Sequence, residues 1–103
     1  MKKGSPRFYE LLDEIADLHD RKSNNYSTDS DPLSNLKMCE QFGVPAYLGV
    51  MVRLSDKWSR LTQLAGGKPD LVGESMIDTL KDMAIYSLLA IILWEKNEKH
   101  QDK

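Results

Sequence analysis

The sequence predicts an all-α protein, and three observations lead to this prediction. Apolar residues recur at three- and four-residue steps in several segments, which is the period of a helix buried along one face. No segment alternates apolar and polar residues as a half-buried strand does. Proline and glycine stand where such helices would begin and end. We expect a four-helix bundle that is oligomeric.

The composition limits what this bundle can be. At 103 residues the chain is expected to form a single domain over residues 1–103, with a core over about residues 6–97. Hydrophobic residues make up 41% and charged residues 29%, which is typical of a chain that folds. The formal net charge of −2 provides no general attraction for polyanions, so neither a nucleic acid polymer nor a membrane is an expected partner.

The location is expected to be cytoplasmic. Cys39 is the only cysteine, which excludes an intramolecular disulfide and favours a reducing compartment. The basic N-terminus is not followed by an apolar run, so we expect no signal peptide. The longest apolar run, Met83 to Trp94, is shorter than the roughly 20 residues that span a bilayer, and we expect it to be buried against protein.

The first helix is expected from about Pro6 to Arg21. Ser5 is a suitable N-cap, and Pro6 then occupies the first helical position. Apolar residues follow on one face: Phe8, Leu11, Leu12, Ile15 and Leu18. The opposite face is acidic and is interpreted as facing solvent: Glu10, Asp13, Glu14, Asp17 and Asp20.

A loop and a short second helix are expected next. Residues 22–31 contain no aliphatic side chain, and their Ser, Asn and Asp residues favour turns. Asp31-Pro32 repeats the combination of an N-cap and a proline, and Gly43 is suited to the end of the helix. The apolar positions between them are Leu33, Leu36, Cys39 and Phe42.

The third helix is expected to begin after Val44-Pro45 and to end at Gly66-Gly67. Its apolar residues alternate steps of four and three, which is the spacing of a packing seam between helices: Tyr47, Met51, Leu54, Trp58, Leu61 and Ala65. A charged stripe lies beside this seam and comprises Arg53, Asp56, Lys57 and Arg60.

The fourth helix is expected to begin near Gly73 or Glu74 and to end around Asn97. Its second half, MAIYSLLAIILW, is apolar nearly all round, and one neighbouring helix can hardly cover it. The sequence therefore predicts self-association into a homo-oligomer, either a dimer or a tetramer.

Three carboxylates on this helix, Glu74, Asp78 and Asp82, follow one another at steps of four and form a stripe that runs into apolar positions. Like charges at this spacing oppose helix formation by roughly 0.2–0.5 kcal/mol per pair, so we expect a cation nearby. One candidate is Mg²⁺, which one or two carboxylates and substrate phosphates commonly hold. The other is a plain salt bridge from Arg53, Lys57 or Arg60 to Asp78 or Asp82, and the spacing leaves both open.

Several local patterns then occur in order: KSNNY at 22–26, DPLSN at 31–35, FGVP at 42–45, VRLSDK at 52–57 with Arg60-Leu61, and ESMIDTLKD at 74–82 with Tyr86. Together they resemble the nucleotide-modification-associated domain of phages and bacteria. This small helical family is related to the MazG-like all-α nucleoside triphosphate pyrophosphohydrolases. The similarity extends over about residues 8–94. It implies that the protein is located in the cytoplasm of a bacterium, or in the cytoplasm of the host cell if a phage encodes the chain.

The resemblance implies an oligomeric MazG-like bundle in which acids bind Mg²⁺, or Mn²⁺ in its place, and a water splits a nucleoside triphosphate into monophosphate and pyrophosphate. Carried over by matching position, the metal-binding acids are Glu74, Asp78, Asp82 and Asp56. Glu74 and Asp78 are the implied catalytic residues. The implied nucleotide-binding residues are Lys22, Asn25, Tyr26, Asn35, Arg53, Lys57 and Arg60.

The chain also departs from the enzymes of this group, which typically carry an ExxE pair on one helix and ExxD on the next. Only Asp56 is present on the third helix, and Thr79 stands where an ExxD pair ending at Asp82 would have its glutamate. Fewer carboxylates imply a single ion, or no ion and no catalysis. The leading hypothesis is Mg²⁺-dependent hydrolysis of nucleoside or deoxynucleoside triphosphates. The alternatives are a non-catalytic nucleotide-binding or regulatory module and a purely structural bundle.

Overall fold

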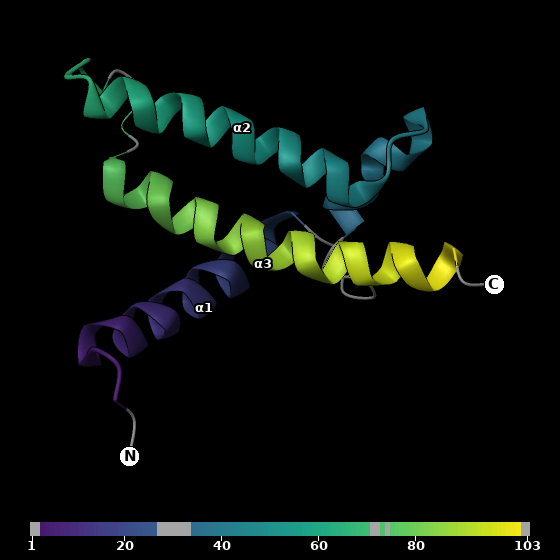
Figure 1. The fold of residues 1–103 in the computed structure, drawn as a ribbon, viewed down its shortest axis with the longest axis horizontal. Helices are drawn as coiled ribbons and strands as arrows, with labels where there is room; N and C mark the ends of the chain where they lie inside the picture. Colours follow the sequence, from purple (N-terminus) through teal and green to yellow (C-terminus); the bar gives the residue numbers. More distant parts are fainter. Residues whose placement is uncertain (1–2, 27–33, 71–72, 74, 102–103) are drawn as a thin grey trace. The chain divides into compact units, whose positions relative to one another are not determined.

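The computed structural model describes residues 3–26, 34–70, 73 and 75–101 (Figure 1). Its regular elements are α-helix α1 (Pro6–Tyr26), 3₁₀ helix η1 (Ser34–Phe42), α-helix α2 (Ala46–Ala65) and α-helix α3 (Met76–Gln101). No strand occurs in these ranges, so the prediction of an all-α protein is confirmed. The chain divides into two compact units, Met1–Asn35 and Leu36–Lys103.

The first unit contains α1, which begins at Pro6 as predicted. The acids of its polar face are exposed, and Arg7 pairs with Glu14 about two turns later at 2.9 Å. The predicted end at Arg21 is wrong, because α1 continues through Lys22 to Tyr26. Serine and asparagine disfavour a helix by only a few tenths of a kcal/mol each, which is too little to stop one already formed. Residues 27–31 of the predicted loop lie outside the described residues.

The second unit is built on an antiparallel pair of helices, α2 and α3, which lie side by side in Figure 1. Near the start of α2, the Tyr47 ring meets the Trp94 ring near the end of α3, with centroids 4.9 Å apart in an edge-to-face arrangement. Further along α2, Lys57 pairs with Asp82 in the first half of α3. The buried apolar side chains of this unit come from η1, α2 and α3: Leu36, Ala46, Val50, Ile85, Leu89 and Leu93.

Helix α2 ends as the glycines predict. Gly67 has a φ of +89°, a left-handed conformation that glycine adopts without a Cβ penalty. The backbone N–H of Lys68 donates to the carbonyl of Gln63 at 3.1 Å, and that of Gly67 donates to Leu64 at 3.1 Å. These two bonds form a Schellman motif, which satisfies carbonyls at the helix end.

The packing face of α2 differs from the predicted seam. Met51 and Trp58, two members of that seam, are 52% and 59% exposed. The buried positions are Ala46 and Val50, and Lys57 lies on the same side. At 100° per residue, the centre of this buried face lies about 80° around the helix axis from the centre of the predicted seam. Apolar residues cover a broad part of α2, so their spacing alone does not select the side that meets α3.

The predicted short second helix exists as η1, which is 3₁₀ and not α-helical. Leu36, Cys39 and Phe42 stand three residues apart, which matches the three residues per turn of this helix. Leu36 is buried, whereas Phe42 is 85% exposed and does not belong to the core. Gly43, with a φ of +81°, ends the element by donating its N–H to the Glu40 carbonyl at 3.1 Å.

Close contact between η1 and α2 requires Gly49. A Cβ at this position would lie 2.6 Å from Cys39 Sγ. We expect Gly49→Ala to lower the free energy of unfolding by about 1 kcal/mol, since a clash of about 2 kcal/mol exceeds the helix propensity gained. In a Cys39→Ala background the same change should stabilise the protein by about 1 kcal/mol. Urea denaturation of the four proteins checks this, and equal effects in both backgrounds would contradict the contact.

Candidate functional site

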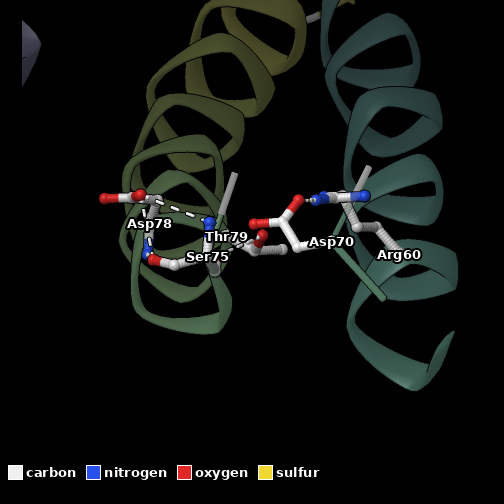
Figure 2. Close-up of polar contacts among 5 residues, drawn as sticks. All are labelled: Arg60, Asp70, Ser75, Asp78 and Thr79. Atoms are coloured by element: carbon white, nitrogen blue, oxygen red, sulfur yellow. Dashed lines mark hydrogen bonds and ion pairs between the residues drawn. The ribbon is translucent and has the colours of Figure 1, made fainter. Parts of the chain in front are cut away.

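The antiparallel arrangement brings basic residues of α2 to acidic residues of α3 and of the segment between the helices. We call this group the hairpin polar cluster, and it consists of Lys57, Arg60, Asp70, Thr79 and Asp82. It lies toward the end of the second unit where α2 finishes and α3 begins, and Figure 2 shows three of its members, Arg60, Asp70 and Thr79. The cluster therefore brings together polar side chains from three segments of the sequence, namely α2, the connection that follows it, and α3.

An ion pair joins the two helices within this cluster. Lys57 Nζ lies 3.0 Å from Asp82 Oδ2, and the two side chains are 21% and 10% exposed. Limited contact with water strengthens the attraction between the charges, but each charge also loses hydration on burial. Of the salt bridges that the spacing left open, this structure contains the one between Lys57 and Asp82, and that structural prediction is confirmed for Asp82.

A second ion pair connects α2 to the segment that follows it. Arg60 Nη2 pairs with Asp70 Oδ1, and the side chains are 20% and 32% exposed. Figure 2 shows the Asp70 carboxylate pointing toward the Arg60 guanidinium. Sequence reasoning missed Asp70, because it stands outside any helix and so belongs to no periodic pattern. The available signal was its position directly after Lys68-Pro69, where a short connection must return the chain to its neighbour.

Asp78 has a local role at the start of α3 (Figure 2). Its Oδ2 accepts hydrogen bonds from the Ser75 hydroxyl at 2.9 Å and the Ser75 N–H at 3.3 Å, while the Asp78 N–H donates to Ser75 Oγ at 3.1 Å. This reciprocal arrangement is a capping box with Ser75 as N-cap. The predicted start near Gly73 or Glu74 is therefore wrong, since α3 begins at Met76. The Ser75-x-x-Asp78 spacing was the signal that went unused.

Thr79 is the most buried polar residue of the cluster, with an exposed fraction of 0%. Its Oγ1 donates to the Ser75 carbonyl at 2.8 Å, one turn earlier in the helix. A threonine hydroxyl can be buried at low cost when it is bonded in this way. The position that would hold a glutamate in an ExxD pair is thus a closed, packed site in this chain.

The remaining predicted residues are distributed unevenly. Arg53 and Asp56 are exposed on α2, and Asp78 is exposed on α3. Lys22 is half-buried on α1 and belongs to the first unit. Glu74 lies outside the described residues, as do the side chains of Asn25, Tyr26 and Asn35. The structure therefore brings together Lys57 and Asp82 from the predicted set, and places Arg60 in the same cluster.

The described residues include some of the side chains that could bind a divalent ion. Among the residues described, no group of three or more His, Cys, Asp or Glu side chains could hold a metal ion. Mg²⁺ needs fewer, because one or two carboxylates suffice when water and substrate phosphates complete its octahedron. Asp78 and Asp82 stand one turn apart on α3, with Glu74 just before them in the sequence, but Asp78 Oδ2 accepts from Ser75 and Asp82 Oδ2 pairs with Lys57.

Comparison with known proteins adds no assignment. No family model matches the chain, and no similar protein was found among curated proteins or solved structures. No helix in the described part is both long enough and apolar enough to cross a membrane.

Proposed function

We propose that the protein is a Mg²⁺-dependent nucleoside triphosphate pyrophosphohydrolase of the MazG-like type. It would convert a nucleoside or deoxynucleoside triphosphate to the monophosphate and pyrophosphate, as a homo-oligomer in the cytoplasm. The observation that carries this proposal is the Lys57–Asp82 contact, because it joins a basic helix face to an acidic one with little access to water. A complex of Mg²⁺ with a triphosphate contains a cation and negatively charged phosphates. It therefore needs acidic side chains near the ion and basic side chains near the phosphates.

In this proposal the acids hold the ion: Asp78 and Asp82, with Glu74 and Asp56 as further ligands. Bound Mg²⁺ would supply charge at the phosphoryl oxygens and a more acidic water. The oxygen of a water molecule would add to the α-phosphorus, and the bond from this phosphorus to the bridging oxygen would break. The bridging oxygen leaves with pyrophosphate, and Glu74 or Asp78 takes the water's proton.

The basic residues act on the phosphates. Lys57, Arg60 and Arg53 donate hydrogen bonds to phosphate oxygens and offset the charge that develops on the departing pyrophosphate. The nucleoside is assigned to residues matched by the sequence resemblance: Lys22, Asn25, Tyr26 and Asn35. Aromatic Tyr26 can stack on a base, and the asparagine amides can read its polar edge.

Binding would exchange the partners within the ion pair. Asp82 cannot hold an ion while its carboxylate faces an ammonium group 3.0 Å away. The proposal therefore requires Lys57 to leave Asp82 and to donate to a phosphate, while Asp82 turns to the ion. Both charges remain compensated throughout this exchange, so neither is left buried alone.

The second candidate is a non-catalytic nucleotide-binding or regulatory module. One observation favours it: both described acids of the α3 stripe already have structural roles, Asp78 in the cap and Asp82 in the ion pair. A bundle of this kind needs no ion to fold. It would bind the same ligands through its basic residues and release them unchanged.

The experiment incubates the full chain with a panel of ribonucleoside and deoxyribonucleoside triphosphates and either Mg²⁺ or Mn²⁺. Monophosphate and pyrophosphate are measured together, because equal yields identify cleavage between the α and β phosphates. We expect turnover that EDTA abolishes and that Asp78→Asn lowers at least tenfold, with Glu98→Gln, an exposed change on the same helix, as the control. Binding without products would favour the module. Neither binding nor products would exclude both.

A further inference from the structure

Helix α3 has two apolar faces. The face toward α2 contains the buried positions Thr79, Asp82, Ile85, Leu89 and Leu93. On the other side, a second set recurs at steps of three, four, four and three: Ile77, Leu80, Ala84, Leu88 and Ile91. At 100° per residue this second set occupies an arc of about 80° centred opposite the first. We call it the outer stripe.

The outer stripe is exposed in a way that a helix on the surface of a two-helix pair normally avoids. Its large side chains are 65% exposed at Ile77, 47% at Leu80, 53% at Leu88 and 54% at Ile91. An amphipathic helix places polar residues opposite its buried face, whereas a contiguous apolar stripe at this spacing marks a surface for another helix. Within the second unit, the stripe is therefore a surface suited to a further helix.

The pattern of the stripe identifies the partner. It reads Ile, Leu, Ala, Leu, Ile in either direction, centred on Ala84. Met76 and Ile92, exposed at 40% and 41%, flank it at equal distances from the same centre. A two-fold interface requires that a residue and its contact exchange places on the other copy. Because the stripe is the same in both directions, two antiparallel copies of α3 would match leucine with leucine and isoleucine with isoleucine on either side of the small Ala84.

We propose that two copies of the chain associate through the outer stripe, with α3 packed antiparallel to its partner and the two-fold axis passing at Ala84. Ile77 then faces Ile91 of the partner subunit, Leu80 faces the partner's Leu88, and the two Ala84 residues let the helix axes approach closely. This inference specifies the self-association included in the proposed function and does not depend on nucleotide hydrolysis.

Charge favours the antiparallel direction. In a parallel pair in register, Lys81 would lie beside the partner's Lys81, and Glu95 beside the partner's Glu95. In the antiparallel pair Lys81 lies beside the partner's Ser87, and no like charges meet at the seam. The antiparallel pair also opposes the two helix dipoles. Residues 83 to 94 include no charged side chain, so the association buries none from this stretch.

Disulfide trapping tests the register. In a Cys39→Ala background, Ala84→Cys should form a covalent dimer under mild oxidation, because its two copies stand nearest the axis. Ser87→Cys is the matched control: its copies are offset by about 9 Å along antiparallel helices at 1.5 Å per residue, too far for a disulfide. A mixture of Leu80→Cys and Leu88→Cys chains should also crosslink, and more than either chain alone.

Sedimentation of the full chain tests the surface. We expect a dimer at micromolar concentration, and Leu88→Lys should weaken it about a hundredfold because it places a charge in the seam. Gln63→Lys, an exposed change on α2, should have no effect, and circular dichroism verifies that both variants fold. A monomeric wild-type chain, or an oligomer unaffected by Leu88→Lys and not trapped at position 84, would overturn the inference. Triphosphate turnover by such a protein would leave the proposed function standing.

Discussion

Replacing Asp82 by alanine is expected to lower the free energy of unfolding by about 3 kcal/mol. The change removes the carboxylate that faces Lys57 Nζ at 3.0 Å and leaves the ammonium group in a site where its side chain is only 21% exposed. Removing one partner of a largely buried pair costs more than the pair itself contributes, because the remaining charge loses the carboxylate that balanced it. Urea denaturation, with the slope m held in common, measures the effect.

A double variant separates stability from function. Lys57→Met with Asp82→Leu replaces both charges by apolar groups of similar size, and such replacements of buried pairs are often neutral or stabilising. We expect this protein to recover most of the stability lost in Asp82→Ala, yet to have no Mg²⁺-dependent turnover. If it remains as unstable as the single variant, the ion pair is not the source of the cost. If it is stable and still hydrolyses triphosphates, Lys57 and Asp82 have no part in the reaction.

The helices that sequence reasoning located best are those with strong local end signals. Gly66-Gly67 predicted the end of α2 because a left-handed residue there has a specific local cause. The end of α1 was misplaced because KSNNY contains only weak helix breakers, and their effect is small beside continued helix propagation. A local sequence signal thus predicts the end of a helix when that end requires a specific backbone conformation. It fails when the residues only have a slightly lower helix propensity.

The candidate site could be predicted only in part, for a different reason. Periodicity gives the direction of a side chain around its own helix, but it does not give the register between two helices. It therefore allowed several pairings among α2 and α3, of which the structure contains Lys57 with Asp82. The packing face of α2 also differs from the apolar seam, and Trp58 is exposed. Asp70 has no helical period, and only the folded connection brings it to Arg60.

Restoring the ExxD spacing by Thr79→Glu is expected to lower the free energy of unfolding by more than about 3 kcal/mol. The Thr79 side chain is 0% exposed, so a larger acidic group would have to displace packed neighbours and bury its charge. Lys57 is already engaged with Asp82 and would have two carboxylates to balance. Chemical denaturation of the purified variant measures this loss.

Thr79→Val is the matched control, since it keeps the branched shape and removes only the hydroxyl. The Ser75 carbonyl that accepts from Thr79 Oγ1 also accepts from the Thr79 N–H at 2.9 Å, so it stays bonded in this variant. We expect a loss of about 1 kcal/mol or less. A Thr79→Glu protein as stable as Thr79→Val, with tighter Mg²⁺ binding than wild type, would show that this position opens toward the ion. The expected loss would show that burial at this position excludes a further carboxylate there, which leaves Glu74, Asp78, Asp82 and Asp56 as the proposed ligands.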